Sequence, residues 1–158
     1  MDVTIRKAQV SDNKDVLRLL KQIAELHHIG RPDIFKGNTK KYSKHEFSKI
    51  LKDKNKPVFV AVDENDNVLG YVFCIVINYK NHAVFNDYHS LYIDDFCVDE
   101  SMRGQNIGKK LFEAIKIYTK EIGVYNIDLT VWEFNEGAIK FYEKCGFATQ
   151  RRRMELIL

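Results

Sequence analysis

The chain has 158 residues, of which 45% are hydrophobic and 30% charged, and its formal net charge is +3. This length suits one domain with a core of two layers, so we expect residues 1–158 to form a single domain. The small net charge argues against nucleic acid as a partner, and no apolar run approaches the length of a membrane span.

The N-terminus and the cysteines both indicate the cytoplasm. The chain is charged from Asp2 onward and lacks the apolar core of a signal peptide. Its three cysteines, Cys74, Cys97 and Cys145, form no Cys-x-x-Cys pair, which favours reduced thiols and argues against a zinc site. We therefore expect a cytoplasmic protein that holds no metal.

The first part of the chain predicts a strand and a long helix. Apolar and polar residues alternate over residues 3–8, as in a strand with one buried face. Ser11 or Asp12 can then cap a helix that ends near Gly30. The apolar residues of this helix recur on one face, at Val16, Leu19, Leu20, Ile23 and Leu26.

A loop, a short helix and a hairpin are expected next. Residues 31–38 carry the proline and glycine of a loop, and such a loop between two helices is a candidate wall of a substrate site. A short amphipathic helix follows over residues 43–51. Strands at 58–62 and 68–78 are joined by the polar turn 63–67, which makes a hairpin.

The second half predicts two more helices and three more strands. The strand at 91–98 completes an antiparallel meander and leads into a helix. A strand at 127–131, a helix at 135–144 ended by Gly146, and a last strand from Phe147 to the C-terminus follow. The first of these helices carries an apolar face at Leu111, Ile115, Tyr118 and Ile122.

The turn before that helix has the features of an anion site. The first backbone N–H groups of a helix lack intrahelical acceptors, and the helix dipole adds partial positive charge there. Gly104 and Gly108 allow close approach to the backbone, and Arg103, Lys109 and Lys110 add positive charge. We expect this turn to bind a pyrophosphate group.

Two common nucleotide-binding patterns do not fit this turn. A Walker phosphate loop would require glycine where Arg103 stands and serine or threonine where Lys110 stands. The dinucleotide pattern Gly-x-Gly-x-x-Gly would require glycine at Asn106. The turn instead resembles motif A of the GNAT superfamily of N-acetyltransferases, on Arg103, Asn106 and Gly108. Asn106 replaces a glycine of that motif, and asparagine is the residue that next best tolerates a left-handed conformation.

A second stretch resembles motif B of the same superfamily. The pattern is Asn, two residues, Ala, two residues, Phe-Tyr, three residues and Gly-Phe. Every position is filled here, by Asn135, Ala138, Phe141, Tyr142, Gly146 and Phe147. The motif resemblance covers residues 91–147, and the order of elements extends it to the whole chain.

The details around both motifs are most similar to the spermidine/spermine and thialysine acetyltransferases. Asp94 and Asp95 lie on the strand before motif A, and Trp132, Glu133 and Phe134 precede motif B. The resemblance implies an α/β fold with a mixed, mostly antiparallel sheet that is splayed at the cofactor site and has helices on both faces. It also implies acetyl-CoA as co-substrate, bound by Phe96, Cys97, Val98, Arg103, Gly104, Gln105, Asn106, Ile107, Gly108, Lys109, Asn135 and Tyr142.

The family chemistry is direct attack of an amine on a thioester. It requires a group that takes the amine proton and a group that protonates the departing thiolate. By resemblance Tyr142 is the general acid. Asp94 is the first candidate for the base, with Asp95 or a chain of waters as the alternatives. Adjacent strand residues point to opposite faces, so Asp94 is expected on the cleft side unless a bulge reverses the two.

The acidic residues favour a small cationic acceptor, such as a polyamine, a diamine or an amino-acid side chain. Asp94, Asp95 and Glu133 are the expected substrate-binding residues, and Asp87 lies in a segment expected near the same cleft. A protein N-terminus, an aminoglycoside, a catalytically silent CoA-binding module and nucleic-acid binding through the C-terminal arginines are the alternatives. No nucleic acid or membrane partner is expected, and the quaternary state is left open, with a homodimer as one option.

Overall fold

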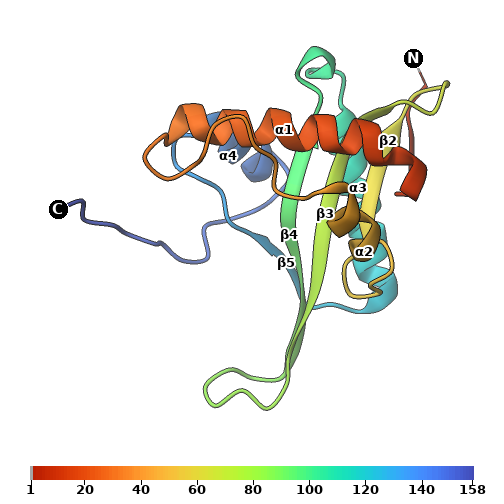
Figure 1. Ribbon diagram of the computed structural model, residues 1–158. Coiled ribbons are helices and arrows are strands. Elements are labelled where there is room, and N and C mark those ends of the chain that lie inside the picture. The colour runs from red at the N-terminus through yellow and green to blue at the C-terminus, as the bar shows by residue number, and fades with distance from the viewer. Residues whose placement is uncertain (1) are drawn as a thin grey trace.

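The computed structural model describes residues 2–158 as a single sheet with helices on both faces (Figure 1). The elements are β1 (Thr4–Lys7), α1 (Asn13–Gly30), α2 (Lys44–Ile50), β2 (Val58–Val62), β3 (Val68–Tyr79), β4 (Tyr88–Val98), α3 (Ile107–Ile122), β5 (Asn126–Leu129) and α4 (Glu136–Lys144), with short 3-10 turns at Val10–Asp12 and Glu100–Met102.

The sheet is mixed, as predicted. Its strand order is β1-β2-β3-β4-β5, so neighbours in the sheet are also neighbours in the chain. The first four strands pair antiparallel, and β5 pairs parallel to β4 because α3 carries the chain back across the sheet. This confirms the antiparallel meander and the mixed α/β class.

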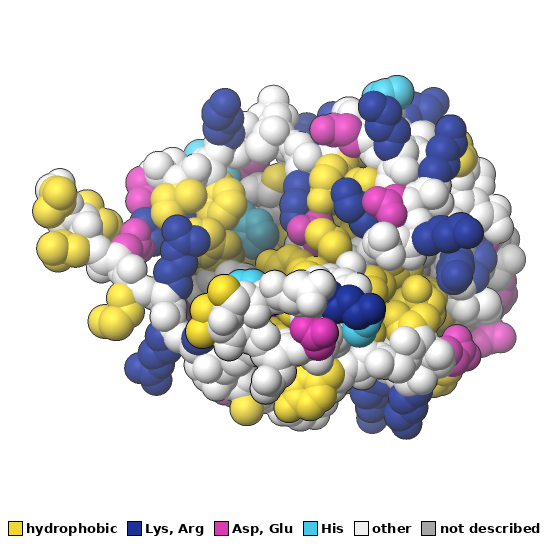
Figure 2. Space-filling model, turned by 90° about the horizontal axis from the view of Figure 1, so that it is seen from below, with side chains coloured by type: hydrophobic (Ala, Val, Ile, Leu, Met, Phe, Trp, Pro, Cys, Tyr) yellow, Lys and Arg dark blue, Asp and Glu magenta, His cyan; other side chains and the backbone are white. Residues whose placement is uncertain are grey.

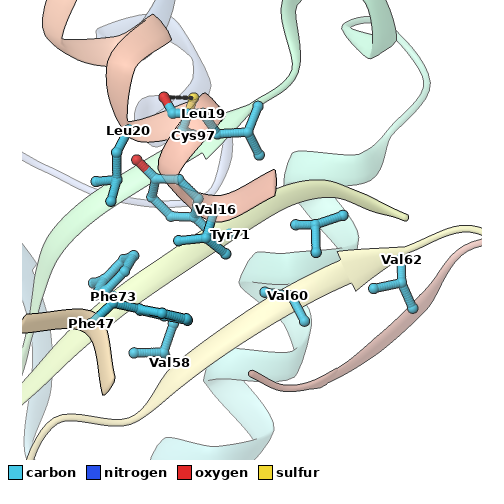
Figure 3. Packing of buried hydrophobic residues seen from close by; sticks show 11 residues of the cluster. Val16, Leu19, Leu20, Phe47, Val58, Val60, Val62, Tyr71, Phe73 and Cys97 are labelled. Atoms are coloured by element: carbon cyan, nitrogen blue, oxygen red, sulfur yellow. Dashed lines mark hydrogen bonds between the residues drawn. The ribbon is translucent and has the colours of Figure 1, made fainter. Parts of the chain in front are cut away.

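Two hydrophobic clusters cover the two faces of the sheet. On one face α1 and α2 bury Leu19, Leu20 and Phe47 against β2 and β3, where Tyr71 and Phe73 are also enclosed (Figure 3). The other face packs against α3 through residues that include Leu91, Ile93, Ile107, Leu111 and Ile115. The amphipathic faces predicted for both long helices therefore account for the two-sided core.

Some local predictions are wrong. The side chain of Asp12 does not cap α1, because its carboxylate accepts from the Gln9 amide at 2.7 Å and pairs with Arg6 at 2.8 Å. Ile122 at the end of α3 is 39% exposed, and Thr119 occupies the buried position on that turn instead. Periodicity fixes the middle of a helix face better than its last turn, where the chain leaves the sheet.

Strands β4 and β5 separate along their length. Their pairing runs from Ser90 and Asn126 to Ile93 and Leu129, and it ends there although β4 continues to Val98. The edge of β4 beyond Ile93 that faces away from β3 therefore has no paired strand. This is the splayed sheet that the family resemblance implies.

The predicted last strand is wrong. Residues 147–158 form no strand, and the end of the chain runs away from the body as an extended arm (Figure 1). Its apolar side chains stand in solvent at the left of Figure 2, with Met154 89%, Leu156 83% and Ile157 75% exposed. Apolar residues near the C-terminus suggest a strand, but a strand also requires a neighbouring strand to pair with. Within residues 2–158 the arm pairs with none. An ion pair between Arg31 and Glu155 ties it to the loop after α1.

Candidate active site

The predicted anion-binding turn opens α3 in the expected conformation. Gly104 has φ of 79°, and a Cβ placed there would meet nothing within 4 Å. Asn106 is the residue before the helix and adopts the left-handed conformation, with φ of 61° and ψ of 11°. This confirms that asparagine keeps the turn that glycine would make. Residues 103–106 are exposed, so the first N–H groups of α3 face an open surface.

Gly108 connects this turn to α4. A Cβ on Gly108 would lie 3.3 Å from two atoms of the Phe141 ring, which is tighter than most Cβ contacts allow. The Phe141 ring in turn lies 5.6 Å from the ring of Phe96 on β4. The glycine therefore lets the start of α3, the splayed part of β4 and α4 pack together at one place.

Tyr142 lies on α4 beside the splayed part of β4. Its ring centroid is 6.3 Å from that of Phe96 and 5.5 Å from that of Phe147. Burial, and after it the negative charge of Asp95, raises the pKa of the Tyr142 phenol above its usual value. The phenol is therefore protonated at neutral pH and lies within the electrostatic reach of Asp95.

Asn135 serves as the N-cap of α4. Its Oδ1 accepts from the Ala138 amide at 3.2 Å, which stabilises the first turn of the helix. Asn135 therefore lies at the start of α4, and its side-chain oxygen already accepts a hydrogen bond from the helix. A contact to an arm of the cofactor stays a prediction for its amide group.

A bulge in β4 changes the expected geometry of the two acids. Phe73 on β3 pairs with Asp95, and the next residue, Cys74, pairs with Ile93, so Asp94 has no partner across the ladder. The expectation that the two aspartates point to opposite faces is wrong, because a bulge places an extra residue on one strand. Both carboxylates lie near one ammonium: Lys41 Nζ is 2.9 Å from Asp94 Oδ1 and 3.9 Å from Asp95 Oδ2.

The two aspartates have different surroundings. The Asp95 side chain is 8% exposed, accepts from the Tyr71 hydroxyl at 3.1 Å, and has a pKa raised to about 6 because its burial outweighs the nearby Lys41. Asp94 accepts from the Tyr42 hydroxyl and from Lys41, and burial together with this carboxylate raises the pKa of Tyr42. Asp95 therefore titrates close to neutrality.

Lys41, Tyr42 and Tyr71 were not among the residues that the sequence singled out. Lys41 and Tyr42 end the loop between α1 and α2, which was predicted as a candidate wall of the substrate site, but nothing in their spacing points to the acids. Tyr71 occupies a strand position that reads as ordinary core. Only the pairing of β3 with β4 brings its hydroxyl to Asp95.

An aromatic cluster lines the same end of the molecule. His27 at the end of α1 stacks on Phe35 with ring centroids 5.0 Å apart, and Phe35 meets Trp132 edge to face at 5.1 Å. Phe134 completes the cluster beside Trp132 at 6.2 Å. It therefore joins the loop after α1, which ends with Lys41 and Tyr42, to the segment between β5 and α4, the helix that carries Tyr142.

The two remaining predicted acids, Asp87 and Glu133, form no hydrogen bond or ion pair with Asp94, Asp95 or Lys41 within residues 2–158. Glu133 is exposed, and within residues 2–158 it makes no hydrogen bond or ion pair. Asp87 accepts from the Asn81 amide at 3.0 Å in the loop between β3 and β4, which extends from the opposite end of the sheet (Figure 1). The expected cluster of four acids is therefore wrong for Asp87.

The side chain of Cys97 points toward α1 and not toward the splayed edge. Its Sγ lies 3.7 Å from the Leu19 carbonyl oxygen (Figure 3), and burial raises the pKa of the thiol to about 12. Only the backbone of Cys97 is left for the predicted cofactor contact. The neutral thiol also argues against covalent catalysis at this position.

A pocket of about 260 Å³ lies between α2 and β3 and includes Asp94, Tyr42 and Phe73 in its wall. Tyr142 and Asp95 do not line it, so it does not connect the acids to the phenol. Among residues 2–158, no three His, Cys, Asp or Glu side chains gather as a metal site. Every helix in that range is too short or too polar to cross a membrane.

The open helix N-terminus beside two separating strands belongs to an α/β domain with a mixed sheet, and such a helix start is an arrangement that suits a phosphate group. The chain matches the acetyltransferase (GNAT) family model over residues 20–147. The protein therefore belongs to the GNAT family, and it is an acetyl-CoA-dependent N-acetyltransferase.

Individual relatives agree with this assignment. Glucosamine 6-phosphate N-acetyltransferase 1 of Dictyostelium discoideum is 30% identical over 121 residues, which cover 76% of this chain and 74% of that protein. L-ornithine N5-acetyltransferase NATA1 of Arabidopsis thaliana is 28% identical over 102 residues, 65% of this chain but only 43% of that protein. A crystal structure of a mutant BH1408 protein from Bacillus halodurans has 35% identity and a TM-score of 0.94 over 98% of this chain and 99% of that one.

Proposed function

We propose that the protein transfers the acetyl group of acetyl-CoA to a primary amine of a small cationic acceptor by direct attack. The observation that carries this proposal is the acid pair, Asp94 and Asp95, whose carboxylates lie 2.9 Å and 3.9 Å from the primary ammonium of Lys41. A site that holds the ammonium of Lys41 on two carboxylates has the charge to hold the ammonium of an acceptor in its place. The neighbouring Tyr42 and Tyr71 hydroxyls keep both carboxylates in place.

The cofactor is expected along the splayed edge of β4 and on the turn before α3. The exposed turn at Arg103, Gly104, Gln105 and Asn106, with the first amides of α3 at Ile107, Gly108 and Lys109, suits a diphosphate. The backbone of Phe96 and Val98 lies on the free edge, where an extended pantetheine arm can pair as a strand would. One of those amides is then available to stabilise charge on the thioester oxygen.

Asp95 is proposed as the base and Tyr142 as the acid. An alkylamine of pKa about 10.4 is neutral in only about one molecule in 10³ at pH 7, so a carboxylate that accepts its proton speeds the attack. Asp95 suits this task better than Asp94, because its pKa of about 6 leaves it ionised yet basic at neutral pH. The raised pKa of Tyr142 keeps its proton available for the thiolate, at some cost in acid strength.

The acid pair and the relatives point to more than one class of acceptor. Polyamines, diamines and amino-acid side chains suit two carboxylates, and the L-ornithine N5-acetyltransferase relative acts on such a side chain. The glucosamine 6-phosphate relative instead takes an acceptor that bears a phosphate group. The spermidine/spermine and thialysine subtype stays a prediction.

A thiol-release assay with a panel of amines tests the proposal. The panel contains spermidine, a short diamine, ornithine, glucosamine 6-phosphate, an aminoglycoside and a peptide with a free N-terminus. We expect the cationic amines to release CoA fastest, and the Asp94→Asn variant to lose much of that preference. Turnover of glucosamine 6-phosphate alone would overturn the acceptor class. Binding of acetyl-CoA without thiol release from any amine would favour the silent CoA-binding module.

We also propose that the protein forms a homodimer through its C-terminal arm. Two features support a second copy of the chain as the partner: the arm exposes Met154 and Leu156 on one side, and β5 is an edge strand with one free side. Light scattering is expected to give twice the monomer mass. The double variant Met154→Asp, Leu156→Asp should be monomeric, whereas the control Arg151→Ser, Arg153→Ser should stay dimeric. A monomeric wild type contradicts the proposal.

The cytoplasm is the compartment that we propose. All three cysteines are free, and Cys74 and Cys97 are buried, so neither of these two is available for an intermolecular disulfide. Localisation of a tagged full-length chain in its own cell would test this.

A further inference from the structure

Lys41 occupies the position that the proposed acceptor amine must reach. Its Nζ contacts Asp94 at two atoms, the side-chain Oδ1 and the main-chain oxygen, each at 2.9 Å, and lies 3.9 Å from Asp95 Oδ2. Since Lys41 is a primary alkylamine, it has the chemistry of the substrate that the enzyme is proposed to use. We propose that Lys41 is itself an acetyl acceptor, and that its self-acetylation uncovers the acid pair for external amines. This inference rests on the proposed function.

Lys41 differs from the other lysines of the chain. Within residues 2–158, the other lysines in ion pairs, Lys56, Lys116 and Lys140, pair with acids three or four residues away at exposed positions. Lys41 instead reaches across 53 residues to a carboxylate on β4. Its side chain is 40% exposed, whereas the carboxylates of Asp94 and Asp95 are 15% and 8% exposed. The fold therefore brings this one amine to an otherwise enclosed acidic site.

The same stretch of β4 connects Lys41 to the proposed acid. Asp94 and Asp95 hold the ammonium, and the next residue, Phe96, contacts the ring of Tyr142 edge to face. The carboxylate of Asp95 is also the largest charge acting on the Tyr142 phenol. Lys41 and Tyr142 thus contact consecutive residues of β4, the strand whose free edge is proposed to receive the thioester.

The reaction balances with the groups already named. Asp95 accepts a proton from the Lys41 ammonium, and the neutral nitrogen forms a bond to the acetyl carbonyl carbon. The bond between that carbon and sulfur breaks, and Tyr142 supplies a proton to the thiolate. The products are free CoA and Nε-acetyl-lysine at position 41. The second amine proton passes to the Tyr142 phenolate and restores the phenol, and Asp95 releases the proton that it accepted to solvent.

Acetylation changes the charge of the site. An ammonium and two carboxylates become two carboxylates without a cation, and the acetylated side chain can no longer form the ion pair. A cationic acceptor then finds the acids uncompensated. Before acetylation, the same acceptor must displace Lys41, so the unmodified enzyme is expected to bind it more weakly.

The first test maps acetylation on the full-length protein. The purified protein is incubated with acetyl-CoA and no acceptor, and each lysine is quantified by peptide mass spectrometry. We expect rapid acetylation at Lys41 and only slow chemical background at the neighbouring Lys40 and Lys44. Tyr142→Phe should slow the reaction at Lys41 by about 10²-fold or more and leave the background unchanged. The variant Lys44→Arg should leave acetylation at Lys41 unchanged.

Two negative results have different meanings. If the enzyme acetylates an amine of the panel while Lys41 reacts no faster than Lys40 and Lys44, the inference is overturned and the proposed function stands. If neither Lys41 nor any amine is acetylated, the proposed function itself fails.

The second test needs no acetyl-CoA. Calorimetry compares spermidine binding to the wild type and to Lys41→Gln, which resembles acetyl-lysine in having no charge. We expect binding to Lys41→Gln to be tighter by about fivefold, the scale of one partly exposed ion pair. Lys41→Arg, which keeps the charge and cannot be acetylated, and the neighbouring control Lys44→Gln should bind as the wild type does. Equal affinity for Lys41→Gln and the wild type overturns the unmasking step.

Discussion

Replacement of Asp95 by asparagine should stabilise the protein and weaken its catalysis at the same time. The pKa of this carboxyl is raised from 3.8 to about 6, mainly by burial. A difference of about two units, at about 1.4 kcal/mol per unit, corresponds to about 3 kcal/mol. This is the free-energy cost of keeping Asp95 ionised in the folded protein at neutral pH. Asparagine has nearly the same shape and carries no charge, so Asp95→Asn should recover part of that cost.

The pH dependence gives the sign. Because the folded pKa lies above the unfolded one, the folded state binds the proton more tightly between pH 3.8 and about 6. The contribution of Asp95 to stability is therefore full below pH 3.8 and is lost as the pH rises through 6. Urea unfolding at several pH values measures this directly. The gain in stability of Asp95→Asn over the wild type should be small near pH 4 and largest above pH 7.

Catalysis should move in the opposite direction. With Asp95 as the base, kcat/KM of the wild type falls below a pKa near 6, and Asp95→Asn should lose this limb together with about 10²-fold or more of its rate. Asp94→Asn is the matched control, since it removes the adjacent carboxylate and leaves Asp95 in place. A variant that is less stable than the wild type at every pH, or that keeps the limb near 6, would refute the assignment of Asp95.

Three further predictions concern the cofactor side. Tyr142→Phe should lower kcat by about 10²-fold without changing the Kd of acetyl-CoA in calorimetry, and an equal loss of both would remove the acid role. Asn106→Val should lower the free energy of unfolding in urea by about 1 to 2 kcal/mol, because φ at this position is 61° and valine tolerates that conformation poorly. Asn106→Gly should leave the stability unchanged or raise it. Equal stability of the two variants would count against strain at this turn. The Gly108→Val side chain should clash with Phe141, which should lower the free energy of unfolding by about 1 to 3 kcal/mol and weaken acetyl-CoA binding. Unchanged stability together with unchanged binding would show that α4 shifts to accommodate the larger side chain.

The sequence was sufficient for the order of elements as far as α4, for the two-sided core and for the conformation of the turn before α3. These depend on local patterns: the period of apolar residues in α1 and α3, and a turn whose residues suit a helix start. The conformation of Asn106 could be predicted because it follows from the preferences of one side chain. The roles of the site residues are still predictions.

The missed features depend on partners distant in the chain. The bulge at Asp94, which the sequence left open as one of two options, arises from the register between β3 and β4, and the β4 sequence alone does not determine that register. Lys41 and the acids are more than 50 residues apart in the chain, so no local sequence pattern predicts their contact. The predicted last strand is wrong because the apolar residues near the end of the chain suggest a strand, whereas the fold provides no neighbouring strand for residues 147–158.

The bulge also determines how the protein tolerates changes in length. Leu91 and Ile93 face α3, and so do Phe96 and Val98, a spacing of two, three and two residues that one extra residue produces. Deleting Asp94 would restore strict alternation and keep all four of these residues on the face toward α3, because the residues on either side of Asp94 already pair with neighbouring residues of β3. The fold should therefore tolerate the deletion, whereas the site would lose one of the two carboxylates that hold Lys41.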